Sequence, residues 1–278
     1  MKINLFSLAQ RPAPIRLGCF ILIMLVPWLF YVAAIYLLVK DENTRTILTM
    51  GILAVEFLFL LPWWSKYIHQ QTRAFPHYGL EFTRKNGVEL LRGVAIGLIS
   101  VLALFSLQGM LGWLVWQPPN FSMVQLVLEG LLTGLGVAFA EELFFRGFIY
   151  DELQRDYNYK SVVWATAIIF AVLHFIKPLP VIISTSPQFL GLLLLGLACV
   201  WAKRSCRGRL GLPIGIHGGL VWCNYIIEVG KLIEYSGKVP QWVTGVNNNP
   251  LAGIMGLLSL LLLALWMRKQ QGTVKRVQ

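Results

Sequence analysis

The chain has 278 residues, of which 56% are hydrophobic and only 13% are charged, and its mean hydropathy is +0.65. Such a composition is too apolar for an ordinary soluble domain. The net charge of +11 does not indicate nucleic-acid binding, because the basic residues flank apolar segments and form no continuous stripe. The composition therefore predicts an integral membrane protein, with the lipid bilayer as its first partner.

Eight apolar segments follow one another along the chain, and most are long enough to cross about 30 Å of hydrocarbon. They are Leu17–Val39, Ile47–Trp64, Gly93–Trp116, Met123–Ile149, Val162–Ile176, Phe189–Ala202, Leu212–Val229 and Leu251–Met267. Barrel strands would alternate in polarity, whereas these segments are continuously apolar. The pattern predicts an all-α, polytopic membrane helix bundle with about eight transmembrane helices. We expect the short fifth and sixth segments to be tilted, interfacial or partly re-entrant.

The distribution of Lys and Arg predicts the orientation of these segments. When alternate connections are grouped, with Arg146 counted in the connection that follows it, 19 of the 24 basic residues fall on one side and 5 on the other. The positive-inside rule places the basic side in the cytoplasm. Both termini are therefore predicted to be cytoplasmic, with an even number of spans between them.

The fourth segment carries ionisable residues in the stretch Glu141-Glu142-Leu143-Phe144-Phe145-Arg146. Charged groups at bilayer depth are costly, so they indicate a functional site. On a helix, Glu142 and Arg146 share a face and are predicted to form an ion pair, whereas Glu141 points about 100° away and has no local partner. Two interpretations remain open. Either the pair is a structural lock and Glu141 marks the exit of the helix to water, or Glu141 is a general base.

Polar residues also interrupt two later segments. His174 lies near the end of the fifth, and His217 lies in the seventh, followed by two glycines that allow close helix approach. Asn224, seven residues after His217, returns to nearly the same helix face. Each residue alone suits a packing role. Together with Glu141 they are the set that a water-activating site requires: a base, a histidine that orients water, and a histidine with an amide to stabilise the oxyanion.

The same three ionisable positions, Glu141, His174 and His217, are also suitable ligands for a divalent metal such as zinc. The helix-borne zinc signature His-Glu-x-x-His is absent from the chain, which disfavours this alternative. We therefore predict a site without metal or other cofactor.

The ordered set Glu141-Glu142-x-x-x-Arg146, Phe170-x-x-x-His174 and His217 resembles the CAAX-protease and bacteriocin-processing (CPBP or Abi) family of glutamic-type intramembrane proteases. The resemblance implies an eight-helix membrane peptidase with a cavity that opens to the cytoplasm. It implies that Glu141 is the base, that His174 helps to activate water, and that His217 and an Asn form the oxyanion site. Supporting roles are implied for Glu142, Arg146 and Phe170.

The chain departs from the family pattern after His217. The family often has Asn or Asp four residues later, where this chain has Val221, and Asn224 is the substitute one turn further on. We divide the chain into N-terminal transmembrane helices 1–3 (residues 1–120), a CPBP/Abi-like catalytic core (121–230), and an outer loop, last transmembrane helix and basic cytoplasmic tail (231–278).

The predicted function is an intramembrane endopeptidase that hydrolyses a peptide bond of a peptide or protein substrate near the cytoplasmic membrane surface. Two alternatives are a non-catalytic membrane scaffold or immunity factor of the same family, and a small proton-coupled transporter. The lack of internal symmetry and of paired broken helices disfavours the transporter. The sequence predicts no particular oligomeric state.

The predicted topology can be tested with reporter fusions. A reporter fused after Gln278 should be cytoplasmic, and one inserted within Asn247–Asn249 should lie on the other side, because few basic residues flank that connection. Reporters on the same side of the membrane would contradict the eight-span topology.

Overall fold

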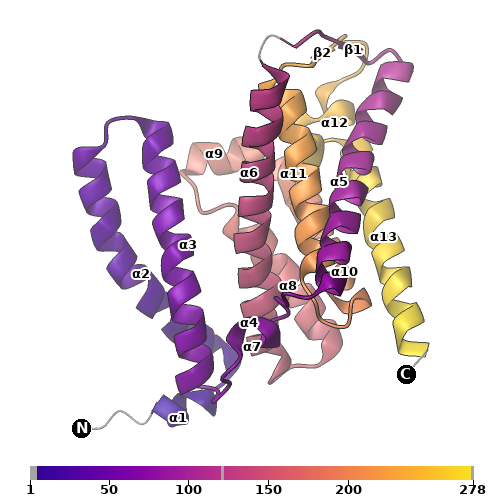
Figure 1. Cartoon of the computed structure of the whole chain (residues 1–278). Helices are drawn as coiled ribbons and strands as arrows, with labels where there is room; N and C mark the ends of the chain where they lie inside the picture. Colours follow the sequence, from indigo (N-terminus) through magenta and orange to yellow (C-terminus); the bar gives the residue numbers. More distant parts are fainter. Residues whose placement is uncertain (1–4, 120–121, 277–278) are drawn as a thin grey trace. The chain divides into compact units, whose positions relative to one another are not determined.

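A computed structural model describes residues 5–119 and 122–276, which are mostly helical (Figure 1). The boundary expected at residues 120 and 121, and the last two residues of the basic tail, lie outside this described part. The chain divides into two compact units, each described here by itself. The N-terminal unit comprises residues 1–78 and 151–158, and the larger unit comprises residues 79–150 and 159–278.

The N-terminal unit is built on a hairpin of two long helices, α2 and α3 (Figure 1). The turn between them ends at Asp41, whose carboxylate accepts a hydrogen bond of 2.6 Å from the Thr44 amide and so caps α3. The helical elements are α1 (Leu5–Ala9), α2 (Ala13–Leu38), α3 (Glu42–Tyr67), α4 (Ala74–His77) and the greater part of α7 (Tyr150–Gln154).

One buried carboxylate joins the ends of this hairpin to the segment 151–158. Glu152 accepts hydrogen bonds from Arg16 Nε at 2.6 Å and Trp64 Nε1 at 2.9 Å, and its Oε1 lies 2.5 Å from His69 Nε2. Arg16 also donates to the Glu152 carbonyl at 2.8 Å. Removing one partner of such a buried pair is costly, so the segment is fixed to α2 and α3.

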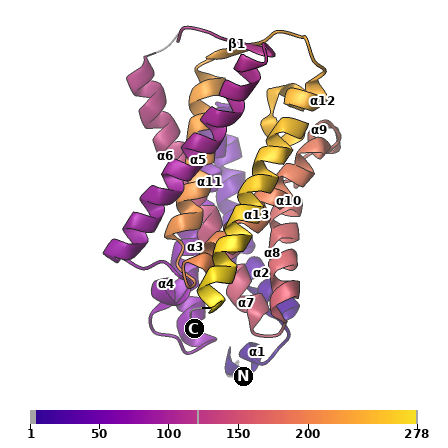
Figure 2. The same cartoon turned by 90° about the vertical axis from the view of Figure 1, so that its right-hand side faces the viewer.

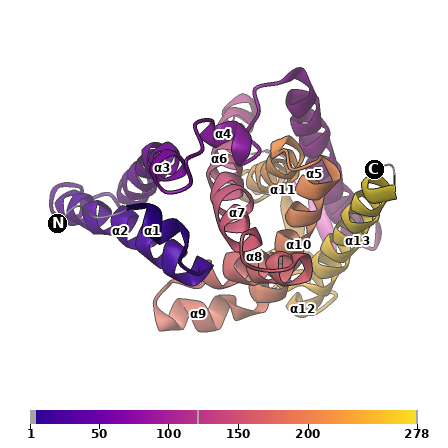
Figure 3. The same cartoon turned by 90° about the horizontal axis from the view of Figure 1, so that it is seen from below.

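The larger unit holds the remaining elements. They are α5 (Arg84–Met110), β1 (Leu114–Trp116), α6 (Met123–Glu142), η1 (Leu143–Ile149), α8 (Tyr159–Leu173), α9 (Leu179–Thr185), η2 (Ser186–Gln188), α10 (Phe189–Ser205), α11 (Gly211–Val229), β2 (Ile233–Tyr235), α12 (Gln241–Thr244), η3 (Val246–Asn248), η4 (Pro250–Ala252) and α13 (Ile254–Arg276). In this unit, α11 packs against α5 and α6, while α10 packs against α8, α11 and α13 (Figures 2 and 3). The helices α6, α8, α10 and α11 therefore form one contiguous bundle.

Glycines bring α11 close to both of its main neighbours. A Cβ atom on Gly97 of α5 would lie 2.5 Å from the Ile216 carbonyl oxygen, and one on Gly219 would lie 2.5 Å from the Val94 carbonyl oxygen. A Cβ on Gly218 would lie 2.8 Å from the Leu135 side chain of α6. The close helix approach predicted from the glycines after His217 is therefore confirmed.

The described residues contain five helices that are long and apolar enough to cross a membrane: Ala13–Leu38, Glu42–Tyr67, Arg84–Met110, Met123–Gln154 and Leu179–Ser205. With the shorter apolar helix α8, they confirm the all-α class expected of a membrane helix protein. Helices α11 and α13 lie where the seventh and eighth spans are expected but are not among the five. The count of eight spans stays a prediction.

The predicted end of the third span is wrong. The helix α5 ends at Met110, and Gly112 follows with a φ of +70°, a left-handed conformation that stops the helix. Residues 114–116 then form strand β1, which pairs antiparallel with β2, with Leu114 opposite Tyr235. An apolar run alone does not distinguish a short strand from the last turn of a helix.

The α5–α11 contact predicts a size limit at Gly97. Gly97→Ala places a methyl group against the backbone of α11, and overpacking of this kind costs about 1–3 kcal/mol. The melting temperature of the purified protein should fall. Gly136→Ala on α6 is the matched control, because no atom lies within 4 Å of its Cβ position and alanine favours a helix. Equal effects of the two substitutions would contradict the close contact.

Candidate active site

The stretch Glu141–Arg146 lies where α6 changes into a π-helix, η1. In η1 the Tyr150 amide donates to the carbonyl groups of Phe145 and Gly147, so it passes over the Arg146 carbonyl that an α-helix would use. Lys203 of α10 donates to that carbonyl instead, at 2.5 Å, although its side chain is only 6% exposed. Single π-turns are rare and often occur at functional sites. The predicted continuous α-helix is wrong at this point.

Glu142 forms the centre of the site. It is completely buried, and its Oε1 accepts hydrogen bonds from Arg146 Nη1 at 3.0 Å and from His217 Nδ1 at 2.9 Å. The predicted Glu142–Arg146 ion pair is therefore confirmed. The pair also holds His217, a contact that the sequence pattern did not predict. One carboxylate thus ties the fourth segment to α11.

The Arg146 guanidinium makes two further contacts. Its Nη2 donates to the Gly196 carbonyl of α10 at 3.2 Å, and its Cζ lies 4.2 Å from the centre of the Phe170 ring of α8. A guanidinium over an aromatic face is attracted by the ring quadrupole. Arg146 therefore joins four helical elements, one of them through the Phe170 ring. The supporting role of Phe170 stays a prediction.

His174 directly follows the last residue of α8, and its ring lies 4.5 Å from the Phe170 ring, centre to centre. Its Nδ1 is 2.7 Å from the Phe170 carbonyl oxygen. A carbonyl oxygen only accepts, so Nδ1 carries the proton of this hydrogen bond. The other ring nitrogen, Nε2, lies 3.7 Å from Glu141 Oε2.

His217 has the same arrangement on α11. Its Nδ1 is used by the Glu142 carboxylate, and its Nε2 lies 3.9 Å from Glu141 Oε2. One oxygen of Glu141 therefore faces the Nε2 atoms of both histidines and has no hydrogen-bond partner in the described part of the chain. The Glu141 and His174 side chains are 28% and 29% exposed, whereas that of His217 is 5% exposed. The three predicted positions on separate helices meet.

Asn224 lies elsewhere on α11. Its side chain interacts with Glu228, and both residues line a cavity that Glu141, His174 and His217 do not line. Among the described residues, no hydrogen bond or ion pair links Asn224 to the Glu141–His174–His217 cluster. Its role as oxyanion partner stays a prediction.

Within residues 5–119 and 122–276, no group of three or more His, Cys, Asp or Glu side chains is arranged to hold a metal ion. The side chains nearest to such a set are Glu141, His174 and His217, whose facing atoms are 3.7 and 3.9 Å apart. Metal independence stays a prediction.

The described part of the chain combines apolar helices of spanning length with a Glu/His cluster where helical segments of the larger unit meet. Residues 123–223 match the Rce1-like family, described as type II CAAX prenyl endopeptidase Rce1-like, which confirms the family resemblance. The matched segment includes Glu141, His174 and His217 and ends one residue before Asn224. Comparison with curated proteins found no match, and comparison with solved structures found none either.

Two residues of the site carry no recognisable sequence signal. Lys203 is part of a basic run after α10, which the charge pattern indicates only as a cytoplasmic flank. Cys199 lies beside the Glu142 carboxylate and reads as one more apolar residue of its segment. Their positions follow from the packing of α10 against η1 and α11, which sequence spacing does not define.

The Glu142 network predicts that Arg146 is required for folding. Arg146→Ala leaves a buried carboxylate without its guanidinium, which costs about 3–5 kcal/mol. Folded yield and melting temperature should both fall. Lys160→Ala, at an exposed position in the first turn of α8, should change stability by less than about 0.5 kcal/mol. Full yield and stability of Arg146→Ala with loss of activity alone would instead assign Arg146 a catalytic role.

Proposed function

We propose that this chain is an intramembrane endopeptidase that hydrolyses a peptide bond near the cytoplasmic membrane surface with water activated by Glu141 and two histidines. The observation that carries the proposal is that Nε2 of His174 and Nε2 of His217 both face the same Glu141 oxygen, at 3.7 and 3.9 Å. The Rce1-like match of residues 123–223 supports a CAAX-type endopeptidase in general.

The two distances are longer than a direct hydrogen bond but suit a bridging water. A water oxygen about 2.8 Å from Glu141 Oε2 is also within hydrogen-bond reach of either histidine nitrogen. Because each Nδ1 proton is already used, by the Phe170 carbonyl in one case and by Glu142 in the other, each Nε2 is directed at this water. Water is thus held by groups whose orientation is fixed.

In the hydrolytic step, Glu141 removes a proton from the water as the water oxygen attacks the carbonyl carbon of the substrate. The carbonyl oxygen becomes the oxyanion of a tetrahedral intermediate. Collapse of the intermediate breaks the C–N bond, and the proton held by Glu141 passes to the leaving nitrogen. The products are a carboxylic acid and an amine, and no other reactant is consumed.

His217 stabilises the oxyanion in this scheme. Its Nδ1–H already donates to Glu142, so Nε2 can donate only when the ring is an imidazolium. The Glu142 carboxylate accepts the hydrogen bond of Nδ1, and Arg146 holds Glu142 in place. His174 is left to orient the attacking water. Asn224, which interacts with Glu228, contributes less.

The site operates without a metal in this scheme, and the substrate is a peptide or protein segment close to the cytoplasmic surface. Cleavage of a membrane-tethered peptide library by the purified protein identifies a substrate. A non-catalytic scaffold or immunity factor would cleave none of the library, and its biological effect would survive substitution of Glu141.

Substitution of Glu141 tests the proposal. Glu141→Gln preserves shape but removes the base, so turnover of a cleavable tethered peptide should fall by roughly 10²–10⁴-fold. Folded yield should change little, because a neutral amide is less costly to bury than a charge. Unchanged turnover in Glu141→Gln would contradict the proposal.

His217 and Asn224 provide a graded comparison in the same assay. His217→Ala should lower turnover by about 10²-fold or more through loss of an oxyanion donor, and Asn224→Ala should lower it by less. An equal loss of turnover in His217→Ala and Asn224→Ala would assign Asn224 to the oxyanion site.

A further inference from the structure

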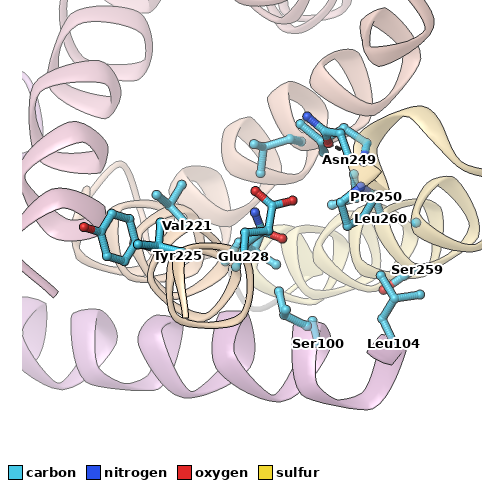
Figure 4. A pocket seen from close by; sticks show the side chains of 16 residues that line it. Ser100, Leu104, Val221, Tyr225, Glu228, Asn249, Pro250, Ser259 and Leu260 are labelled. Atoms are coloured by element: carbon cyan, nitrogen blue, oxygen red, sulfur yellow. Dashed lines mark hydrogen bonds between the residues drawn. The ribbon is translucent and has the colours of Figure 1, made fainter. Parts of the chain in front are cut away.

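The larger unit contains a cavity, separate from the Glu141 cluster, with a volume of about 280 Å³ (Figure 4). It lies among α5, α10, α11, η4 and α13, and neither Glu141 nor the two site histidines line it. Most of its wall is aliphatic, from Val101, Leu104, Leu195, Leu220, Val221 and Leu260. Of the residues in the proposed mechanism, only Asn224 lines this cavity.

A few polar groups interrupt the apolar wall. The Glu228 carboxylate points into the space between α11 and the residues around Asn249 and Pro250 (Figure 4). Asn224, one turn before Glu228 on α11, interacts with its side chain. An apolar pocket with a few convergent polar groups is the usual form of a small-ligand site. Here the strongest of those groups is an anion.

Glu228 is exposed to solvent and has no protein cation paired with it in the described part of the chain. The last turn of α11 contains no basic residue, and no Lys, Arg or His side chain forms an ion pair with this carboxylate. The C-terminal end of a helix carries partial negative charge, which makes a carboxylate there less favourable still. A positively charged ligand would relieve both effects.

The size of the cavity limits the ligand. Its volume is just below the roughly 300–1,000 Å³ found for ligand pockets, so it suits one short chain and excludes a whole lipid. We infer that this cavity binds an alkylammonium group, with the ammonium on Glu228 and the aliphatic chain against Leu104, Leu220 and their neighbours. Such a group is present in a free short-chain amine and in the side chain of a peptide lysine.

Binding of n-butylamine to the full chain, measured by ligand-observed NMR in detergent micelles, tests this inference without any assay of proteolysis. Butylamine should bind about tenfold or more weakly to Glu228→Gln than to the wild type, because the substitution removes a charge-assisted hydrogen bond. Glu234→Gln is the matched control. Glu234 is an exposed carboxylate of β2 that lies outside the cavity and accepts a hydrogen bond from Gln117.

Two comparisons complete the experiment. n-Butanol, which has the chain without the charge, should bind more weakly than butylamine and should not distinguish wild type from Glu228→Gln. A short capped peptide with lysine, compared with its norleucine analogue, shows whether the alkylammonium group comes from a peptide or from a free amine. Binding of the lysine peptide alone, and only when Glu228 is present, assigns the cavity to peptide side chains. No such selective binding assigns it to free amines.

Equal binding of butylamine to wild type and to Glu228→Gln would overturn the inference, as would equal binding of butylamine and butanol. The same loss in Glu234→Gln would also overturn it, because the effect would then be general surface charge. None of these outcomes bears on the endopeptidase proposal, which rests on Glu141.

Discussion

The buried carboxylate of Glu142 is the constraint on which the site depends. It has no exposed surface, so its charge must be balanced inside the protein, and Arg146 and His217 do so through the same oxygen. These two contacts fix the fourth segment to α11 and set the direction of the His217 ring. Glu141, the next residue along the chain, is thereby left with one oxygen directed at two histidines. The contacts of Glu142 therefore account both for the supporting Glu142–Arg146 pair and for the position of Glu141 as the proposed base.

The π-helix is the backbone counterpart of this arrangement. Its wider register deprives the Arg146 carbonyl of the usual amide donor, and a buried lysine of α10 supplies the missing hydrogen bond. Helix α10 also receives the Arg146 guanidinium on the Gly196 carbonyl, where the lack of a side chain lets α8 approach closely. An irregular helix at membrane depth is tolerated when neighbouring protein groups satisfy its backbone, as they do here. The irregularity therefore depends on α10 as much as on its own residues.

Much of this organisation can be predicted from the sequence because it depends on local spacing. Apolar runs predict the helices, the four-residue interval predicts the Glu142–Arg146 pair, and the order of the Glu and His positions gives the family resemblance that residues 123–223 confirm. What cannot be predicted depends on contacts between segments distant in the chain. The π-register needs Lys203, and the strand after α5 needs a partner strand in which Glu234, opposite Val115, lies 119 residues further along the chain. Likewise, periodicity places Asn224 on the face of His217, but only packing shows that it interacts with Glu228.

The proposed mechanism depends most directly on the protonation of the two site histidines. The chain has only four histidines, so ¹⁵N-histidine labelling with single-residue variants can assign every ring nitrogen in the purified protein. The account predicts that Nδ1 of both His174 and His217 carries a proton, donated to the Phe170 carbonyl and to Glu142, and that Glu142→Gln disturbs His217 alone. The contradicting result is a wild-type protein in which either histidine carries its proton on Nε2 and not on Nδ1. The Nδ1 atom of that histidine could then not donate to the Phe170 carbonyl or to Glu142.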